Sequence, residues 1–284
     1  MYLLIILQQL IAAGTHIVAK SITHNIPSEI VLFFRVLLVS IIFAIWMLFN
    51  KSKVKRIEKS DYKTLILLGF VNIPINQFLF LKSMEYTSAP HVALAYALTP
   101  AFVFIIALFL LNEKASKPKI LGLSLAIGGT ILVLSEKFSF ASGGLTGDIL
   151  ALLASFSWAI YTIIGKKLTL KYGAIYTTAL AMMIGFLLYI PIFLILPVHI
   201  QLEKFTLINW GQIIYLGALT SALGYAIWYY ALGKTDASKV SIFNNLQPIM
   251  TAILSYFILG TGFSIEFILG GLFVIIGVFI TQRS

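Results

Sequence analysis

The sequence predicts an all-α integral membrane protein, with ten transmembrane helices arranged as two inverted five-helix repeats. Three observations support this fold class. Hydrophobic residues make up 60% of the 284 residues and charged residues only 11%, whereas a soluble domain has about 25% charged residues. The apolar residues form long continuous runs. Segments of the first half also recur in the second half at a constant offset.

This composition excludes several classes of protein. With a mean hydropathy of +1.00, the chain has too few polar residues to cover a soluble enzyme or a free nucleic-acid binder. We therefore interpret the net charge of +10 as a topology signal and expect no nucleic-acid partner. Cysteine is absent, so there are no disulfides or thiolate ligands. The expected partners are a lipid bilayer and a small-molecule substrate, with no cofactor and no metal.

Ten apolar runs approach the roughly 20 residues that a bilayer-spanning helix needs. A closed barrel is excluded because its strands would alternate polar and apolar residues. The first run follows Met1 without a basic segment, so we expect a span there and not a cleaved signal peptide. The predicted spans are Tyr2–Ala19, Pro27–Phe49, Tyr62–Leu81, Pro90–Leu111, Pro118–Leu134, Gly147–Gly165, Gly173–Leu196, Ile208–Leu232, Ala237–Leu259 and Phe263–Ile280.

The positions of the basic residues predict the orientation of these spans. Fifteen of the 20 Lys and Arg residues fall on the side of the N-terminus, four fall on the opposite side, and Arg35 lies inside a span. Cytoplasmic loops carry such an excess of Lys and Arg. We therefore expect both termini in the cytoplasm, in a multi-pass protein of the plasma or inner membrane.

The internal repeat divides the chain into two halves, residues 1–140 and 141–284. Thr87, Ala89 and Pro100 of the first half correspond to Thr235, Ala237 and Pro248 of the second, each 148 residues later. Each half has five spans, an odd number, so the second half must be inverted in the membrane relative to the first. Many secondary transporters have this architecture, with the substrate site near the midplane between the repeats.

Several motifs occur in a fixed order along the first half. They are Phe34–Arg35, NQFLFLKSMEYTSA at 76–89, ALAYALTP at 93–100, LLNE at 110–113 and a helix with Gly122 and Gly129. This ordered set resembles the EamA family of the drug/metabolite transporter superfamily, and the resemblance covers essentially the whole chain. One departure is that Thr261 stands where the second copy of Glu113 would be expected.

The resemblance implies a ten-helix secondary permease for small metabolites, a class that includes amino acids, sugars and nucleotide derivatives. It favours export of amino acids or related compounds by alternating access. One alternative is a flippase for lipid-linked substrates. A membrane-embedded enzyme is a weaker alternative, because Ser124 has no histidine base on a later helix. We therefore expect no catalytic residues.

Two prolines predict helix breaks at the midplane. Pro100 and Pro248 lie about 15 Å into their spans at 1.5 Å per residue. Each removes a helical hydrogen bond, which frees the carbonyls of Tyr96 and Asn244. Symmetric breaks at this depth are typical of a transporter substrate site. The alternative is a plain kink whose carbonyls a neighbouring helix satisfies.

Amides and aromatic residues at similar depth are the candidate substrate contacts. Amides are costly against lipid, so they should face protein or a cavity, and hydrogen bonds between helices are the alternative use. An aromatic cavity with amides suits an amphipathic zwitterion or a planar metabolite. The candidates are Asn72, Asn76, Gln77, Tyr96, Trp158, Tyr161, Tyr225, Asn244, Asn245 and Gln247, with Gln8 and Gln9 as weaker ones.

Charged and titratable groups are scarce inside the predicted spans. Arg35 either binds a substrate carboxylate or has a structural role, which we favour because the family pattern carries Arg here across many cargoes. No carboxylate lies mid-membrane as an obvious proton or sodium relay. His16 and His91 could titrate, but we expect each to be a hydrogen-bonded helix-end residue.

Overall fold

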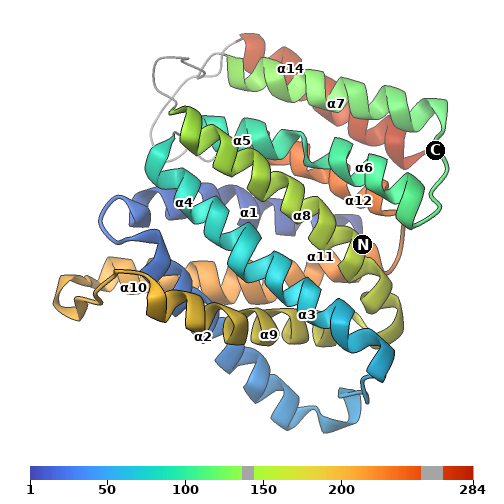
Figure 1. The fold of residues 1–284 in the computed structure, drawn as a ribbon. Coiled ribbons are helices and arrows are strands. Elements are labelled where there is room, and N and C mark those ends of the chain that lie inside the picture. The colour runs from blue at the N-terminus through green and yellow to red at the C-terminus, as the bar shows by residue number, and fades with distance from the viewer. Residues whose placement is uncertain (88, 136–143, 251–264, 284) are drawn as a thin grey trace.

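The architecture is a bundle of membrane-spanning helices. The computed structural model covers residues 1–87, 89–135, 144–250 and 265–283, and helical segments occupy each of the ten predicted spans, the ninth as far as residue 250. Both termini lie at the same end of the bundle, which we call the terminal end (Figure 1). An even number of crossings requires this arrangement.

The first repeat contributes eight helical segments in five spans. The third span is interrupted by a π-helical segment and the fourth by a break at Leu98. The segments are α1 (Tyr2–Thr23), α2 (Ser28–Phe49), α3 (Tyr62–Phe70), π-helical η3 (Val71–Gln77), α4 (Phe78–Tyr86), α5 (Ala89–Ala97), α6 (Thr99–Leu110) and α7 (Lys117–Ser135).

The second repeat has the same order of elements. Its third span also contains a π-helical segment, and its fourth begins with a short α-helix and a 3₁₀ segment. The segments are α8 (Leu145–Tyr172), α9 (Ala174–Ile195), α10 (Leu207–Ile214), π-helical η5 (Tyr215–Gly224), α11 (Tyr225–Leu232), α12 (Ala237–Ser241), 3₁₀-helical η6 (Ile242–Asn245) and α14 (Ile265–Gln282). The expected boundary between repeats, at residues 140 and 141, lies outside the described residues.

Six helices in the described part of the chain are long and apolar enough to cross a bilayer. Their outward side chains are large and apolar, for example Leu187 and Ile195, as expected for a surface against lipid. The six are Tyr2–Thr23, Ser28–Phe49, Lys59–Tyr86, Leu145–Tyr172, Ala174–Ile195 and Leu207–Leu232.

Helices α1 and α8 are among those that continue past the ends that the sequence suggested. Helix α1 does not stop at Ala19, because the Lys20 ammonium donates to the carbonyls of Met84 and Thr87 at 2.6 and 3.0 Å. Helix α8 likewise continues past Gly165, because the Lys166 ammonium donates to the carbonyl of Thr235 at 2.8 Å. The expected ends were too early because these lysines have carbonyl partners within the protein.

The two π-helical segments correspond to each other in the repeats. Residues 71–76 of η3 plus the offset of 148 give residues 219–224, which all belong to η5. Pro74 explains the irregularity of η3 because it removes a backbone donor, whereas η5 contains no proline. π-helical turns are rare in helices and are frequently found at functional sites. Their recurrence at one depth therefore points to the centre of the bundle.

Glycines bring helices α7 and α14 into backbone contact. A Cβ atom on Gly129 would lie 2.5 Å from the carbonyl oxygen of Gly270, and one on Gly277 would lie 2.5 Å from the carbonyl oxygen of Gly122. Since Gly122 and Gly129 correspond to Gly270 and Gly277 at the 148-residue offset, the contact is reciprocal. The pseudo-twofold axis that relates the repeats therefore passes between these two helices.

This contact predicts opposite effects of one substitution at two adjacent glycines. Gly129→Ala should lower the free energy of unfolding by about 1–3 kcal/mol, because the new methyl group overpacks the α14 backbone. Among the described residues, no atom beyond the helix's own backbone lies within 4 Å of the would-be Cβ of Gly128, so Gly128→Ala should be neutral or stabilising by up to about 1 kcal/mol. Thermal unfolding of both variants in one detergent measures this. Equal shifts would contradict the close approach of α7 and α14.

Candidate substrate cavity

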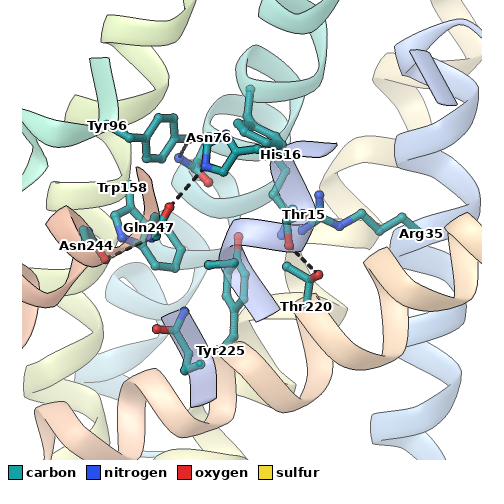
Figure 2. Close-up of a pocket in the computed structure, with 14 residues that line it drawn as sticks. Thr15, His16, Arg35, Asn76, Tyr96, Trp158, Thr220, Tyr225, Asn244 and Gln247 are labelled. Atoms are coloured by element: carbon teal, nitrogen blue, oxygen red, sulfur yellow. Dashed lines mark hydrogen bonds between the residues drawn. The ribbon is translucent and has the colours of Figure 1, made fainter. Parts of the chain in front are cut away.

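A cavity lies at the centre of the bundle, between the two repeats (Figure 2). The space open to the centres of water molecules is about 70 Å³, which is room for several waters. Arg35 enters from one side, and Trp158, Asn244 and Gln247 lie across from it. The lining residues are Gln8, Ala12, Thr15, His16, Arg35, Asn76, Gln77, Phe80, Tyr96, Trp158, Thr220, Tyr225, Asn244 and Gln247.

The local helix geometry explains why these residues meet. Gln8, Ala12, Thr15 and His16 recur at the three- and four-residue spacing of one helical face, so α1 presents a single polar stripe to the cavity. The η3 and η5 segments present Asn76 and Gln77 and, from the other repeat, Thr220. The hydroxyls of Thr15 and Thr220 are hydrogen bonded at 2.8 Å, which joins α1 to η5.

A chain of amides joins α1 to the ninth span. The Gln247 amide nitrogen donates to the Gln9 amide oxygen at 2.8 Å, and the Gln9 nitrogen donates to the Gln8 oxygen at 2.8 Å. The Gln9 nitrogen also lies 3.3 Å from the Asn244 oxygen. Gln8 faces the cavity, while Gln9 is fully buried behind it. The network thus holds the irregular start of the ninth span against a regular helix.

Arg35 is a buried cation at the cavity wall. Its side chain is 2% exposed, and its Nε donates to the Ser221 hydroxyl at 2.8 Å. Its NH1 atom is buried and has no hydrogen-bond partner among the described residues. Among the described residues, no Asp or Glu lines the cavity. A buried, unpaired donor on a charged group is costly, so the arrangement leaves Arg35 ready to bind an anion.

Aromatic rings form the opposite wall. The Trp158 ring is edge-on to Tyr225, with centroids 4.8 Å apart, and is tilted against Trp228 at 5.6 Å. Tyr161 stacks on Tyr229 at 5.0 Å and lies behind Trp158. Offset and edge-on pairs of this kind stabilise one another beyond the area that they bury. The wall can therefore present a rigid apolar surface to a bound molecule.

Comparison with known proteins identifies the family. The profile of the EamA-like transporter family matches residues 1–135 and 145–283. The chain belongs to the EamA-like transporter family. This family, of the drug/metabolite transporter superfamily, is one of transporters and not of enzymes. The protein is therefore a multi-pass membrane transporter.

Several relatives of this EamA-like transporter cover most of its length. An uncharacterized transporter of Archaeoglobus fulgidus is 30% identical over 100% of this chain and 97% of its own. The uncharacterized transporter YyaM of Bacillus subtilis is 29% identical over 85% and 80%. One solved crystal structure has a TM-score of 0.79 and covers 99% of this chain and 96% of its own. At 13% identity, that likeness shows the fold alone.

The cavity brings together most of the residues that the sequence singled out in this transporter. Three candidates lie behind its wall. Asn72 accepts from Gln77 at 3.2 Å and donates to the Met182 sulfur at 3.4 Å, while Tyr161 and Asn245 are fully buried. The candidates that line the cavity are Arg35, Asn76, Gln77, Tyr96, Trp158, Tyr225, Asn244 and Gln247.

The two prolines lie outside the cavity lining. Pro100 stands at the start of α6, just after the break at Leu98, and lines a smaller cavity beside Ser238 and Thr281. Pro248 is buried three residues after η6. Both prolines follow an irregular turn, so they adjoin the site through the backbone and do not contribute side chains to the main cavity.

Some residues at the cavity escaped the sequence analysis. Thr15, Thr220 and Ser221 are hydroxyls in apolar helices, and a hydroxyl can also be satisfied by its own helix. One signal was available for Thr220, because it lies 148 residues after Asn72 and so occupies the equivalent position in the other repeat. No comparable signal marks Ser221, whose partner Arg35 is 186 residues away.

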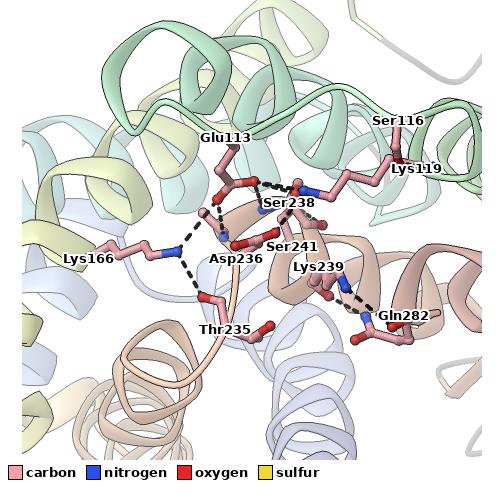
Figure 3. Close-up of polar contacts among 11 residues, drawn as sticks. Glu113, Ser116, Lys119, Lys166, Thr235, Asp236, Ser238, Lys239, Ser241 and Gln282 are labelled. Atoms are coloured by element: carbon pink, nitrogen blue, oxygen red, sulfur yellow. Dashed lines mark hydrogen bonds and ion pairs between the residues drawn. The ribbon is translucent and has the colours of Figure 1, made fainter. Parts of the chain in front are cut away.

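An ion-pair cluster occupies the terminal end (Figure 3). The Glu113 carboxylate accepts from the Ala237 backbone N–H at 2.6 Å and from the Ser238 hydroxyl at 2.5 Å. The ammonium groups of Lys119 and Lys166 lie 3.6 and 3.5 Å from it. Glu113 therefore caps the start of the ninth span and links it to α7 and α8.

Asp236 is a more exposed member of the same cluster. Its carboxylate lies 2.8 Å from the Lys119 ammonium. Partial burial acts to raise the pKa of this carboxyl, but the hydrogen bond from Lys119 and the nearby lysine charges hold the pKa below its usual range. Asp236 thus stays ionised at neutral pH.

The cluster predicts that two equivalent amide substitutions differ in effect. Glu113→Gln should lower the free energy of unfolding by about 2–4 kcal/mol, because it removes a buried charge that has several donors. Asp236→Asn makes the same chemical change at a side chain that is 44% exposed, and should cost less than about 1 kcal/mol. Thermal unfolding of both variants at pH 7 measures the difference. An equal loss would mean that Glu113 does not hold the ninth span.

Proposed function

We propose that this transporter carries small metabolites with a carboxylate group, amino acids or related compounds, by alternating access around the central cavity. The observation that carries the proposal is the unpaired N–H of Arg35 at the cavity wall. A substrate carboxylate would accept from it with the geometry that a guanidinium group favours. This assignment differs from the structural role that the sequence favoured, because Ser221 and the Tyr225 hydroxyl pair only part of the guanidinium group and its NH1 atom has no partner in the described structure.

The rest of the cavity supports an amphipathic substrate. Two further buried atoms at its wall lack hydrogen-bond partners in the described structure. One is a donor, the amide nitrogen of Asn244, and the other is an acceptor, the amide oxygen of Gln77. Beside them, Trp158 and Tyr225 offer an apolar surface. A zwitterion with an apolar side chain has an acceptor for Arg35, donors for an amide oxygen and a surface for the rings.

Transport requires this cavity to change shape. Its 70 Å³ is below the roughly 300 Å³ at the lower end of small-molecule sites, so the substrate must enter through another state. The irregular segments η3, η5 and η6 border the cavity and lack regular α-helical hydrogen bonding, which suits them to bend. Rocking of one repeat against the other is the usual form of alternating access for inverted repeats.

The excess of Lys and Arg at the terminal end supports a cytoplasmic location for both termini, in the cell membrane. We propose export as the direction, by analogy with the family. The proton gradient and the membrane potential would then be the available sources of energy for moving a substrate outward.

Binding by the detergent-purified protein tests the function. A ligand that binds only the folded state raises the melting temperature, so at least one of the twenty protein amino acids should do so. The corresponding amine without the carboxylate should not. If only lipid-linked sugars raise the melting temperature, the protein is better explained as a flippase. If no compound with a carboxylate raises it, the proposal is contradicted.

Arg35→Met should weaken binding of the amino acid that gives the largest shift by about 10- to 100-fold, because a hydrogen bond to a charged group is worth about 1.5–3 kcal/mol. Arg35→Lys keeps the charge but loses the planar fork, so it should recover part of the affinity. Isothermal calorimetry measures both. If Arg35→Met binds the amino acid with unchanged affinity, Arg35 has a structural role and does not bind the substrate.

A further inference from the structure

His16 presents an unpaired nitrogen to the same cavity as Arg35. The side chain is 6% exposed, and its ring packs edge-on against Phe80 and Tyr96, with centroids 5.3 and 5.9 Å away. Its Nε2 lies 3.1 Å from the Gln247 amide oxygen. Its Nδ1 is buried and has no partner among the described residues. Figure 2 shows the ring at the cavity wall, on a different side from Arg35.

The amide chain assigns the proton of this imidazole. The Gln247 nitrogen donates to Gln9, so the Gln247 oxygen is the atom that faces His16. An amide oxygen can only accept, and Nε2 therefore carries the hydrogen. In the neutral ring, Nδ1 then has a free lone pair. The cavity thus combines an unpaired donor on Arg35 with an unpaired acceptor on His16.

The charged and titratable groups around His16 leave it without a carboxylate partner. The cavity also holds Arg35 from α2, Tyr96 from α5 and Tyr225 from α11. On its own helix, Lys20 donates to backbone carbonyls. On η5, the Tyr215 hydroxyl donates to the Ile11 carbonyl. The acids of α2 and α4, Glu29 and Glu85, each lie 2.8 Å from Lys82.

We propose that Nδ1 of His16 is a coupling site where a proton and the ammonium group of the substrate compete, so that the transporter exchanges substrate for a proton. This proposal rests on the proposed function. In the neutral state, Nδ1 accepts from the substrate ammonium while Arg35 holds its carboxylate. When Nδ1 takes a proton from solution, the ring becomes a cation that repels the ammonium, and the substrate leaves.

His16 suits this role better than the other titratable groups of the cavity. An arginine stays protonated in proteins and a tyrosine titrates near pH 10, whereas histidine ordinarily changes charge between pH 5 and 8. A protonated His16 would also be a second cation beside Arg35, without an acid at the described cavity wall to compensate it. One proton bound for each substrate released would let an inward proton gradient drive export.

The test is the pH dependence of binding, measured by calorimetry from pH 4 to 8 with the amino acid that most stabilises the protein. Binding by the unaltered protein should tighten as pH rises, by up to tenfold per pH unit below its midpoint. His16→Gln retains an amide nitrogen that can donate to Gln247 but cannot be protonated, so its affinity should not depend on pH. The exposed His24 serves as the control, and His24→Gln should keep the unaltered profile.

A second measurement needs no variant. Near the midpoint, amino acid binding should release protons, and the observed heat should therefore change between buffers of different ionisation enthalpy. Flat affinity across pH in the unaltered protein, or a normal pH profile in His16→Gln, would overturn the coupling role and leave the permease intact. If no amino acid binds at any pH, the proposed function fails, and the coupling role fails with it.

Discussion

The hydrocarbon of a bilayer offers no hydrogen bonds, so the polar side chains within the spans of this chain face the protein interior, where other helices or a cavity surround them. This constraint explains where the polar side chains lie. Asn72, Asn76 and Gln77 are buried against other helices, and Thr15 and Thr220 bind each other across the repeats. Once such groups converge, they create an environment where irregular helices such as η3 and η5 are tolerated, buried in protein and beside a polar cavity.

The inverted repeat builds the same contact twice, once at each end of the bundle. Lys20 binds the Thr87 carbonyl at one end, and Lys166 binds the equivalent Thr235 carbonyl at the other. The repeats then diverge in their acids. Glu113 gathers two lysines at the terminal end, whereas its counterpart in the sequence is a threonine. The two ends of the bundle are therefore held together by different contacts.

The sequence predicts the spans, the repeat and the burial of the amides, because hydropathy and a fixed offset are local or periodic signals. It predicts less about what those side chains do. The role of the Arg35 side chain depends on its hydrogen bond to Ser221, which is 186 residues away. It also depends on the absence of a partner for NH1 in the described structure. The η5 segment contains no proline from which its π-helical geometry could have been predicted. Such features depend on contacts between residues that are far apart in the chain, and these contacts cannot be predicted from one sequence by its hydropathy or its repeats.

The choice of a hydroxyl as the partner of Arg35 has a physical consequence. An aspartate at position 221 would pair with the guanidinium more strongly, but it would neutralise the charge and compete with any anion that enters the cavity. Ser221 orients the guanidinium through Nε and leaves its charge intact. Under the proposed function, the cavity consequently keeps a net attraction for a carboxylate, and any second cation there, including a protonated His16, works against a bound ammonium group. Recognition and coupling can thus arise from the same uncompensated charge.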